Sequence, residues 1–340
     1  MLPCATQSAG REDKLPAAER RGLYLRASMS VIFTALAPVF LIIALGATLR
    51  RILLTDPAHW AALEKLTYFV LFPSLLIVSA VKADLSQVNV LAVGGALIGS
   101  VVILSGLILL VHRPLIAALA ADGPGFTSLF QGAVRWNTYI VLAVAGGLFH
   151  AEGITIAALA LVAMIPVVNI IAVLVLASFA GRHPPTFGYV IGQLGRNPYI
   201  WSCALGAALN ATHFPVPAVI VEFGDILGRA SLALGLLVVG GGLVLDRLTK
   251  PRPIVFASLA LKLLVKPAIA LVLSLLLGLT GTELVVVAIT AAVPSAPNGY
   301  VLARQMGGDA PLLAEILTLQ IIAAAITLPV VVAVAKMLAG

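Results

Sequence analysis

Long apolar segments, spread along the whole chain, most limit how this sequence can fold. A helix needs about 20 mostly apolar residues to cross the hydrocarbon core of a membrane. Ten segments approach or exceed that length: 30–49, 66–81, 88–111, 127–149, 154–180, 199–211, 226–245, 254–279, 284–303 and 312–335. Only 10% of the 340 residues are charged, against roughly 25% in soluble domains. Outside closed barrels only helices satisfy their own backbone in lipid, so we expect an all-α integral membrane protein with ten transmembrane helices.

Several sequence features recur at a nearly constant spacing, which indicates an internal repeat. Three pairs of features lie 161 residues apart and a weaker pair lies 160 apart: Asn137 and Asn298, Gly146-Gly147 and Gly307-Gly308, Glu64 and Asp225, and ALGATL at 44–49 with ALGAAL at 204–209. A repeat of five spans is odd, so two fused copies would enter the membrane with opposite orientation, as in many secondary transporters. We therefore predict two inverted five-helix repeats, 29–180 and 199–340, joined by a short cytoplasmic linker at 181–198.

Lysine and arginine are concentrated on one side of the predicted membrane. The odd-numbered loops carry ten of them and the opposite side carries three. This excess marks the cytoplasmic side, so both termini are predicted to face away from the cytoplasm across the inner membrane. Residues 1–28 hold five more basic residues that would have to cross, and they lack the apolar core of a signal peptide. We expect a disordered extension, which is absent if translation starts at Met29.

One span contains several helix breakers near its centre. AVPSAPNGY, at 292–300, places two prolines, an asparagine and a glycine inside the span 284–303. Proline removes a backbone hydrogen bond and clashes with the preceding turn, and irregular backbone at membrane depth is tolerated only where protein buries it or where it lines a cavity. The matching part of span 127–149 reads Arg135-Trp136-Asn137-Thr138, without proline. We predict that both spans, the fourth and the ninth, are broken and cross.

Such a crossing would bring two helix N-termini to one cavity, where their partial positive charge and free N–H groups suit an anion. Arg135 points to the same chemistry, because an arginine in the middle of a span costs about 2.5–3.5 kcal/mol on insertion scales and is usually functional. A structural pair with a carboxylate is the alternative, although no acid lies in the middle of a span. The candidate substrate-binding residues are Arg135, Asn137, Thr138, Tyr139, Pro294, Ser295, Pro297, Asn298, Gly299 and Tyr300, with Lys262 as possible support.

Several of these residues have a plainer interpretation. Asn137 and Asn298 could satisfy backbone groups freed by the breaks, and the tyrosines could serve packing. Lys262 and Lys266 lie one helical turn apart, and Lys266 could extend to the membrane boundary. Glu315 is expected to be a solvated acid in the first turn of the last span rather than an ion site. The histidines and cysteines lack metal-ligand spacing, so neither a metal nor a cofactor is predicted.

Three stretches resemble the auxin efflux carrier family, which includes bacterial permeases often described as malonate transporters. They are MSVIFTALAPVFLIIALGATLRR at 29–51, KLLVKP at 262–267, and AAVPSAPNGYVLARQMGGDAPLLAEILTLQ at 291–320 with TLPVV after it. The resemblance implies a scaffold domain and a transport domain that work by elevator-type alternating access. It also implies a substrate site at the crossing of helices four and nine, at Asn137, Thr138, Pro297 and Asn298. The sequence departs from this pattern at Arg135-Trp136, and its central linker is short.

Together these features predict a secondary transporter of small organic anions such as carboxylates. A channel or a membrane sensor on a transporter fold is the alternative. The spans hold no paired acids, HExxH motif or nucleophile with a base, so no enzyme is predicted. The predicted partners are an organic anion, the lipid bilayer and a second copy of the chain, and no nucleic acid. The sequence leaves open the substrate, the direction of transport and the coupling ion.

Overall fold

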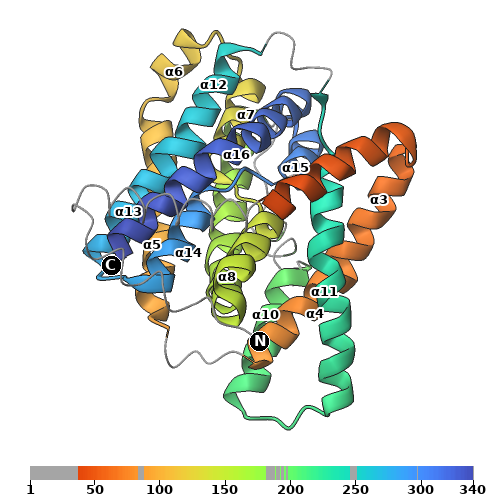
Figure 1. Ribbon diagram of the computed structural model, residues 1–340. Coiled ribbons are helices and arrows are strands. Elements are labelled where there is room, and N and C mark those ends of the chain that lie inside the picture. Colours follow the sequence, from red (N-terminus) through yellow and green to blue (C-terminus); the bar gives the residue numbers. More distant parts are fainter. Residues whose placement is uncertain are drawn as a thin grey trace, which may run out of the picture.

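The computed structural model describes residues 37–82, 88–180, 188, 192, 195–196, 198–245, 251–296 and 298–339. The predicted extension 1–28, most of the linker 181–198, and Pro297 lie outside the described residues. Within them all regular structure is helical, which confirms the all-α prediction (Figure 1). The elements are residues 37–52, α3 (Pro57–Leu66), η1 (Thr67–Leu71), α4 (Phe72–Lys82), α5 (Val90–Leu110), α6 (His112–Ala118), α7 (Gly123–Val134), α8 (Thr138–Phe179), α10 (Pro198–Ala211), α11 (Ala218–Gly241), α12 (Pro253–Ala260), η4 (Leu261–Val265), α13 (Lys266–Leu276), α14 (Gly281–Ala292), α15 (Asn298–Met306) and α16 (Ala310–Ala339).

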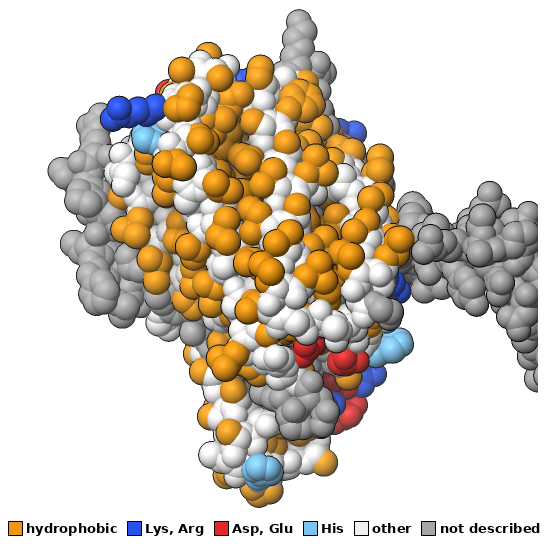
Figure 2. Space-filling view, turned by 90° about the vertical axis from the view of Figure 1, so that its left-hand side faces the viewer, with side chains coloured by type: hydrophobic (Ala, Val, Ile, Leu, Met, Phe, Trp, Pro, Cys, Tyr) orange, Lys and Arg blue, Asp and Glu red, His pale blue; other side chains and the backbone are white. Residues whose placement is uncertain are grey.

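Six helical stretches among the described residues are long and apolar enough to cross a membrane. They are 57–82, 90–110, 123–179, 218–241, 253–276 and 310–339, and α14 is a shorter apolar helix. Large apolar side chains such as Leu91 and Leu276 are more than three-quarters exposed. Figure 2 shows apolar side chains over most of one face, with charged groups along its margins. This distribution fits contact with lipid rather than water.

The helix ends follow local signals. Asp56 caps α3 by accepting a hydrogen bond from Ala58 N at 2.8 Å, and Pro57 stands in the first turn, where its missing N–H costs nothing. The helix expected from residue 66 therefore begins at Pro57, and the helix expected from residue 226 begins at Ala218. Residues 138–179 form one continuous element only formally, because His150 has non-helical backbone angles (φ 51°, ψ −130°) that separate the fourth and fifth spans.

Two of the prolines inside spans follow a π-helical turn. η1 ends two residues before Pro73, and η4 ends two residues before Pro267. A proline ring clashes with the carbonyl four residues earlier, which lies inside the π turn in both cases. The wider turn accommodates that clash and lets the helix continue. In the second case the π turn holds Lys262, and Lys266 follows it directly.

The helices form two groups with α8 between them (Figure 1). One group contains residues 37–52, α3, η1, α4, α10 and α11, and α4 packs against both α10 and α11. A Cβ atom on Gly240 would collide with the carbonyl of Ile43, so glycine lets α11 approach the helix 37–52 closely. The other group contains α5, α7 and α12–α16, with α14 packed against α16, α13 and α8. The two breaks lie where these groups meet.

Candidate functional site

Both of the predicted spans 127–149 and 284–303 are interrupted. α7 ends at Val134, Arg135 is extended (φ −66°, ψ 167°), and α8 begins at Thr138. α14 ends at Ala292, Val293 is extended (φ −62°, ψ 151°), and α15 begins at Asn298. The fourth span therefore breaks without a proline. Asn137 caps the new N-terminus, because its Oδ1 accepts hydrogen bonds from the backbone N–H of Tyr139 at 3.0 Å and of Ile140 at 3.2 Å.

The two irregular segments contact each other. The Ser295 hydroxyl donates to the carbonyl of Gln131, at the end of α7, across 3.0 Å. A Cβ atom on Gly299 would stand 3.0 Å from Cδ of Arg135, so a larger residue there would press on the arginine. Residues of the two predicted breaks, 163 or more positions apart, are thus brought together at one place.

Arg135 is buried at this crossing, with 4% of its surface exposed. Its Nε donates to Oε1 of Gln131 at 3.0 Å, and its Nη1 lies 3.3 Å from Oδ1 of Asn169 and 3.2 Å from Oδ1 of Asn298. All three acceptors are neutral amides. None of the ion pairs formed by the described residues includes Arg135. The guanidinium is therefore held in place without an opposite charge, and the alternative of a carboxylate partner finds no support among the described residues.

A small cavity of about 30 Å³ opens beside this guanidinium. Its lining residues come from both groups of helices: Tyr68, Arg135, Trp136, Thr138, Ile165, Val168, Asn169 and Asn298. One water needs about 10–15 Å³ by this measure, so the cavity has room for about two. A dicarboxylate is larger, so it would need these two groups to separate.

The other predicted site residues lie around the cavity rather than on it. Tyr139 is buried, and its ring stacks on Phe72 with centroids 4.5 Å apart, so it is a packing residue. Tyr300 packs against a small cluster that includes Leu313. Pro294 is buried, and Ser295 forms the backbone contact described above.

Polar side chains from α13 and α16 satisfy the backbone at the breaks. Gln320 is fully buried; its Oε1 accepts from Ser295 N at 2.9 Å and its Nε2 donates to the carbonyl of Gly132 at 3.0 Å. Nζ of Lys266 donates to the carbonyl of Val134 at 2.6 Å. The last four carbonyls of a helix have no partner within it, and these contacts supply some of the missing donors.

Sequence reasoning missed Gln131, Asn169 and Gln320. The signal that could have found them is an uncharged amide inside an apolar span, because such groups usually bond across helices. Their partners were not predictable, since Asn169 and Gln320 reach the crossing from other helices. Arg135 and Asn298, in contrast, were predicted and lie within hydrogen-bond distance of each other.

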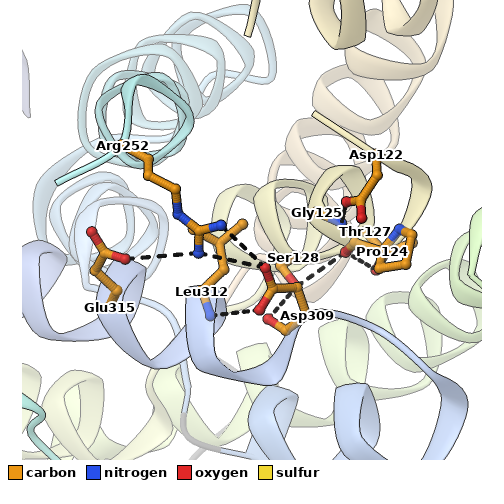
Figure 3. A network of polar contacts seen from close by, with 9 residues as sticks. All are labelled: Asp122, Pro124, Gly125, Thr127, Ser128, Arg252, Asp309, Leu312 and Glu315. Carbon is orange, nitrogen blue, oxygen red and sulfur yellow. Dashed lines mark hydrogen bonds and ion pairs between the residues drawn. The ribbon is translucent and has the colours of Figure 1, made fainter. Parts of the chain in front are cut away.

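Two interpretations of charged residues are wrong. Lys266 does not extend to the membrane boundary: it and Lys262 are both fully buried, and the Lys262 amine has no hydrogen-bond partner among the described residues. Glu315 is not solvated, since only 7% of it is exposed and one carboxylate oxygen lies 3.8 Å from Arg252. Arg252, the residue before α12, lies within ion-pair distance of Glu315 and of Asp309, the residue before α16 (Figure 3).

Figure 3 shows how this network ties together the ends of three helices. Asp309 caps α16 by accepting from Leu312 N at 2.9 Å, and its carbonyl accepts from the Ser128 hydroxyl of α7 at 2.8 Å. Asp122 caps α7 in the same way, through Gly125 N at 2.8 Å. The network joins α7, α12 and α16 at the end of the molecule where the loops preceding α7, α12 and α16 meet. These same helices carry the residues that surround the breaks.

Comparison with known proteins points to transport. Residues 186–332 match the family described as membrane transport protein, and the match spans somewhat less than half of the chain, including α10 to α15 and most of α16. No curated protein matches the chain significantly. The matched region contains KLLVKP and the stretch around the break between α14 and α15, on which the resemblance to auxin efflux carriers was based. Together with the apolar helices, the match supports that resemblance and indicates a multi-pass membrane transport protein.

Proposed function

We propose that the protein is a secondary transporter of small organic anions such as carboxylates, and that the anion binds where the two broken helices cross. The observation that carries the proposal is Arg135, a buried guanidinium that borders the cavity and has only neutral amides as partners. Burying a charge without an opposite charge is costly. An anionic substrate would provide the missing charge at the moment it binds.

The surroundings of Arg135 favour a carboxylate in particular. Thr138 and Asn298 begin α8 and α15, and both line the cavity. A helix N-terminus carries a partial positive charge, although at α8 the N–H groups of Tyr139 and Ile140 are already bonded to Asn137. The planar guanidinium matches the two oxygens of a carboxylate. The amides of Asn169 and Asn298 can turn from accepting to donating when an anion arrives.

The helix arrangement supports alternating access by an elevator-type movement. α3 and α11 begin at Pro57 and Ala218, which are 161 residues apart, the same offset as the sequence repeat. This agreement supports two inverted five-helix repeats. Tyr68 lines the cavity from the group that contains α4 and α11, whereas Asn298 lines it from the other group. Sliding of one group against the other would open and close the site. The polar network that joins the starts of α7, α12 and α16 would let the group containing these helices move as a unit.

The energy source follows from the charges. The described residues place no carboxylate against Arg135, so a sodium ion has no acidic ligand there. One charge moved across 100 mV releases about 2.3 kcal/mol, enough to drive an anion outward. A proton gradient is the other source compatible with this site.

The test is counterflow of labelled malonate and related carboxylates in proteoliposomes. We expect saturable exchange by the wild type, which a channel would not show. Arg135→Gln should lower the initial rate at least about tenfold, since hydrogen bonds to charged groups contribute about 1.5–3 kcal/mol each. Arg304→Gln is the matched control, because Arg304 is exposed on α15 and does not line the cavity. Wild-type rates in both Arg135→Gln and Asn298→Ala, at normal membrane levels, would refute the site.

A further inference from the structure

Lys266 places its side-chain amine at the C-terminal end of α7, immediately before Arg135 in the chain. Its Nζ donates to the carbonyl of Val134, the last residue of that half-helix, at 2.6 Å. The side chain is fully buried. A helix C-terminus carries partial negative charge and free carbonyl groups, so an ammonium group is favourably placed there.

In transporters built from broken helices, the C-terminal end of a half-helix is a common place for a bound cation. In such proteins the C-terminal ends of half-helices and the unwound carbonyls hold the coupling cation, while the N-terminal ends hold the anionic substrate. Here the neighbouring carbonyls of α7 are bonded to protein donors, Gln131 to the Ser295 hydroxyl and Gly132 to Gln320. The carbonyl of Val134 is bonded to Lys266. Three of the last four carbonyls of α7 are therefore bonded to protein groups and are not free to bind a cation from solution.

We propose that Lys266 is a tethered cation that takes the place of a coupling ion at the C-terminus of α7. Because this cation is part of the chain, the C-terminal carbonyl of α7 is always bonded to it. The next residue, Arg135, is thereby kept in position for the anion. Transport then requires no sodium. The transport part of this inference rests on the proposed function, whereas the binding of a cation to the end of α7 does not.

Lys262 provides a matched comparison. It lies one turn before Lys266 and is equally buried, but its amine has no hydrogen-bond partner among the described residues. The two amines interact with each other, so removing Lys262 deletes a neighbour of the Lys266 amine but leaves no carbonyl unpaired. Its loss should therefore need no replacement by a cation from solution.

The first test measures thermal unfolding in detergent, and it determines whether an added amine restores the stability of a variant that lacks the Lys266 side chain. Lys266→Ala deletes a propylammonium fragment and leaves the carbonyl of Val134 without a donor. We expect a lower Tm that n-propylammonium chloride partly restores and that choline chloride, a cation without N–H groups, does not. The Tm of the wild type and of Lys262→Ala should not respond to propylammonium. An unchanged Tm in Lys266→Ala, or a lowered Tm that neither propylammonium nor sodium raises, would overturn the proposal.

A second pair of variants covers the case in which Lys266→Ala fails to fold. Lys266→Arg keeps a cationic donor, whereas Lys266→Gln keeps a neutral one. We expect Lys266→Arg to retain most of the stability and Lys266→Gln to lose it. Equal stability of the two variants would show that a donor suffices and that the charge has no role.

The transport measurement separates this inference from the proposed function. Carboxylate counterflow by the wild type should be equal in sodium and in choline media, whereas Lys266→Ala should be inactive in choline and regain activity with sodium or propylammonium. A wild-type rate that depends on sodium would contradict a tethered cation. If the wild type moves no carboxylate at all, the proposed function fails, and the unfolding measurements still decide whether Lys266 acts as a bound cation.

Discussion

Replacing Gln320 by leucine tests whether the crossing depends on side chains from outside the broken helices. Gln320 is fully buried in α16 and makes three contacts at the crossing. It accepts from Ser295 N at 2.9 Å and donates to the carbonyl of Gly132 at 3.0 Å, and it lies 3.4 Å from Oγ of Ser258. Leucine is similar in size, so Gln320→Leu removes the hydrogen bonds and largely keeps the packing.

The size of the effect follows from the groups left behind. Hydrogen bonds between membrane helices contribute about 0.6 kcal/mol on average, so losing three costs about 2 kcal/mol. Two of the partners are backbone groups at membrane depth, and an unsatisfied buried group costs about 1–3 kcal/mol, which gives about 2–6 kcal/mol. We expect a loss near the lower end, about 2–3 kcal/mol, because the unfolded chain in a membrane also finds partners.

The assay is equilibrium unfolding in mixed micelles, followed by circular dichroism. Thr327→Val is the matched control on the same helix, because the Thr327 hydroxyl is buried without a partner among the described residues. Its removal should leave the free energy of unfolding unchanged or raise it. If Gln320→Leu stays within about 0.5 kcal/mol of the wild type, Gln320 does not support the crossing and the reasoning from unsatisfied backbone is wrong.

Two further substitutions test the cap and the close helix approach. Asn137→Ala should lower the free energy of unfolding by about 1 kcal/mol, because it removes the acceptor for two N–H groups at the start of α8; Asn137→Ser, which can still cap, should restore most of it. Gly240→Ala should lower it by about 1–3 kcal/mol or more, because the added methyl group meets the carbonyl of Ile43. Gly106→Ala, which meets nothing within 4 Å, is its control and should be neutral or stabilising. Equal stability of these two glycine variants would contradict the close packing of α11.

Local chemistry explains which parts of the fold were predictable. Proline, asparagine and glycine at 294–299 interrupt a helix wherever it packs, so the break before α15 could be predicted from that stretch alone. The break before α8 carries no such local signal. It was predicted from the offset of 161 residues and from the cost of Arg135, and both features depend on sequence alone. Asp56-Pro57 is a typical helix start and could have predicted that α3 begins at Pro57. The polar residues of its first turns hide this start from a prediction based on apolar segments.

What could not be predicted is the identity of partners. Lys262 and Lys266 both lie in an apolar stretch of sequence, and only the packing of these residues against α7 gives Lys266 a carbonyl partner. Glu315 is an acid in a first turn, a position typical of solvated residues. In the structure it is buried and lies 3.8 Å from Arg252, which is far away in sequence. Pairings between distant segments depend on tertiary structure, which the local pattern does not contain.

The polar residues at the crossing fall into two sets: one stabilises the fold, and the other is expected to act in transport. Ser295, Gln320 and Lys266 bond to backbone groups that the breaks leave open, so the crossing holds together without a substrate. Arg135 has neutral partners and borders the cavity, so its charge contributes little to folding and lacks a counter-charge until an anion arrives. An uncompensated buried charge is costly, so removing the charge of Arg135 offsets the loss of its hydrogen bonds to three amides. Variants of Gln320 should therefore lose stability and transport together, whereas Arg135→Gln should lose transport and keep its stability.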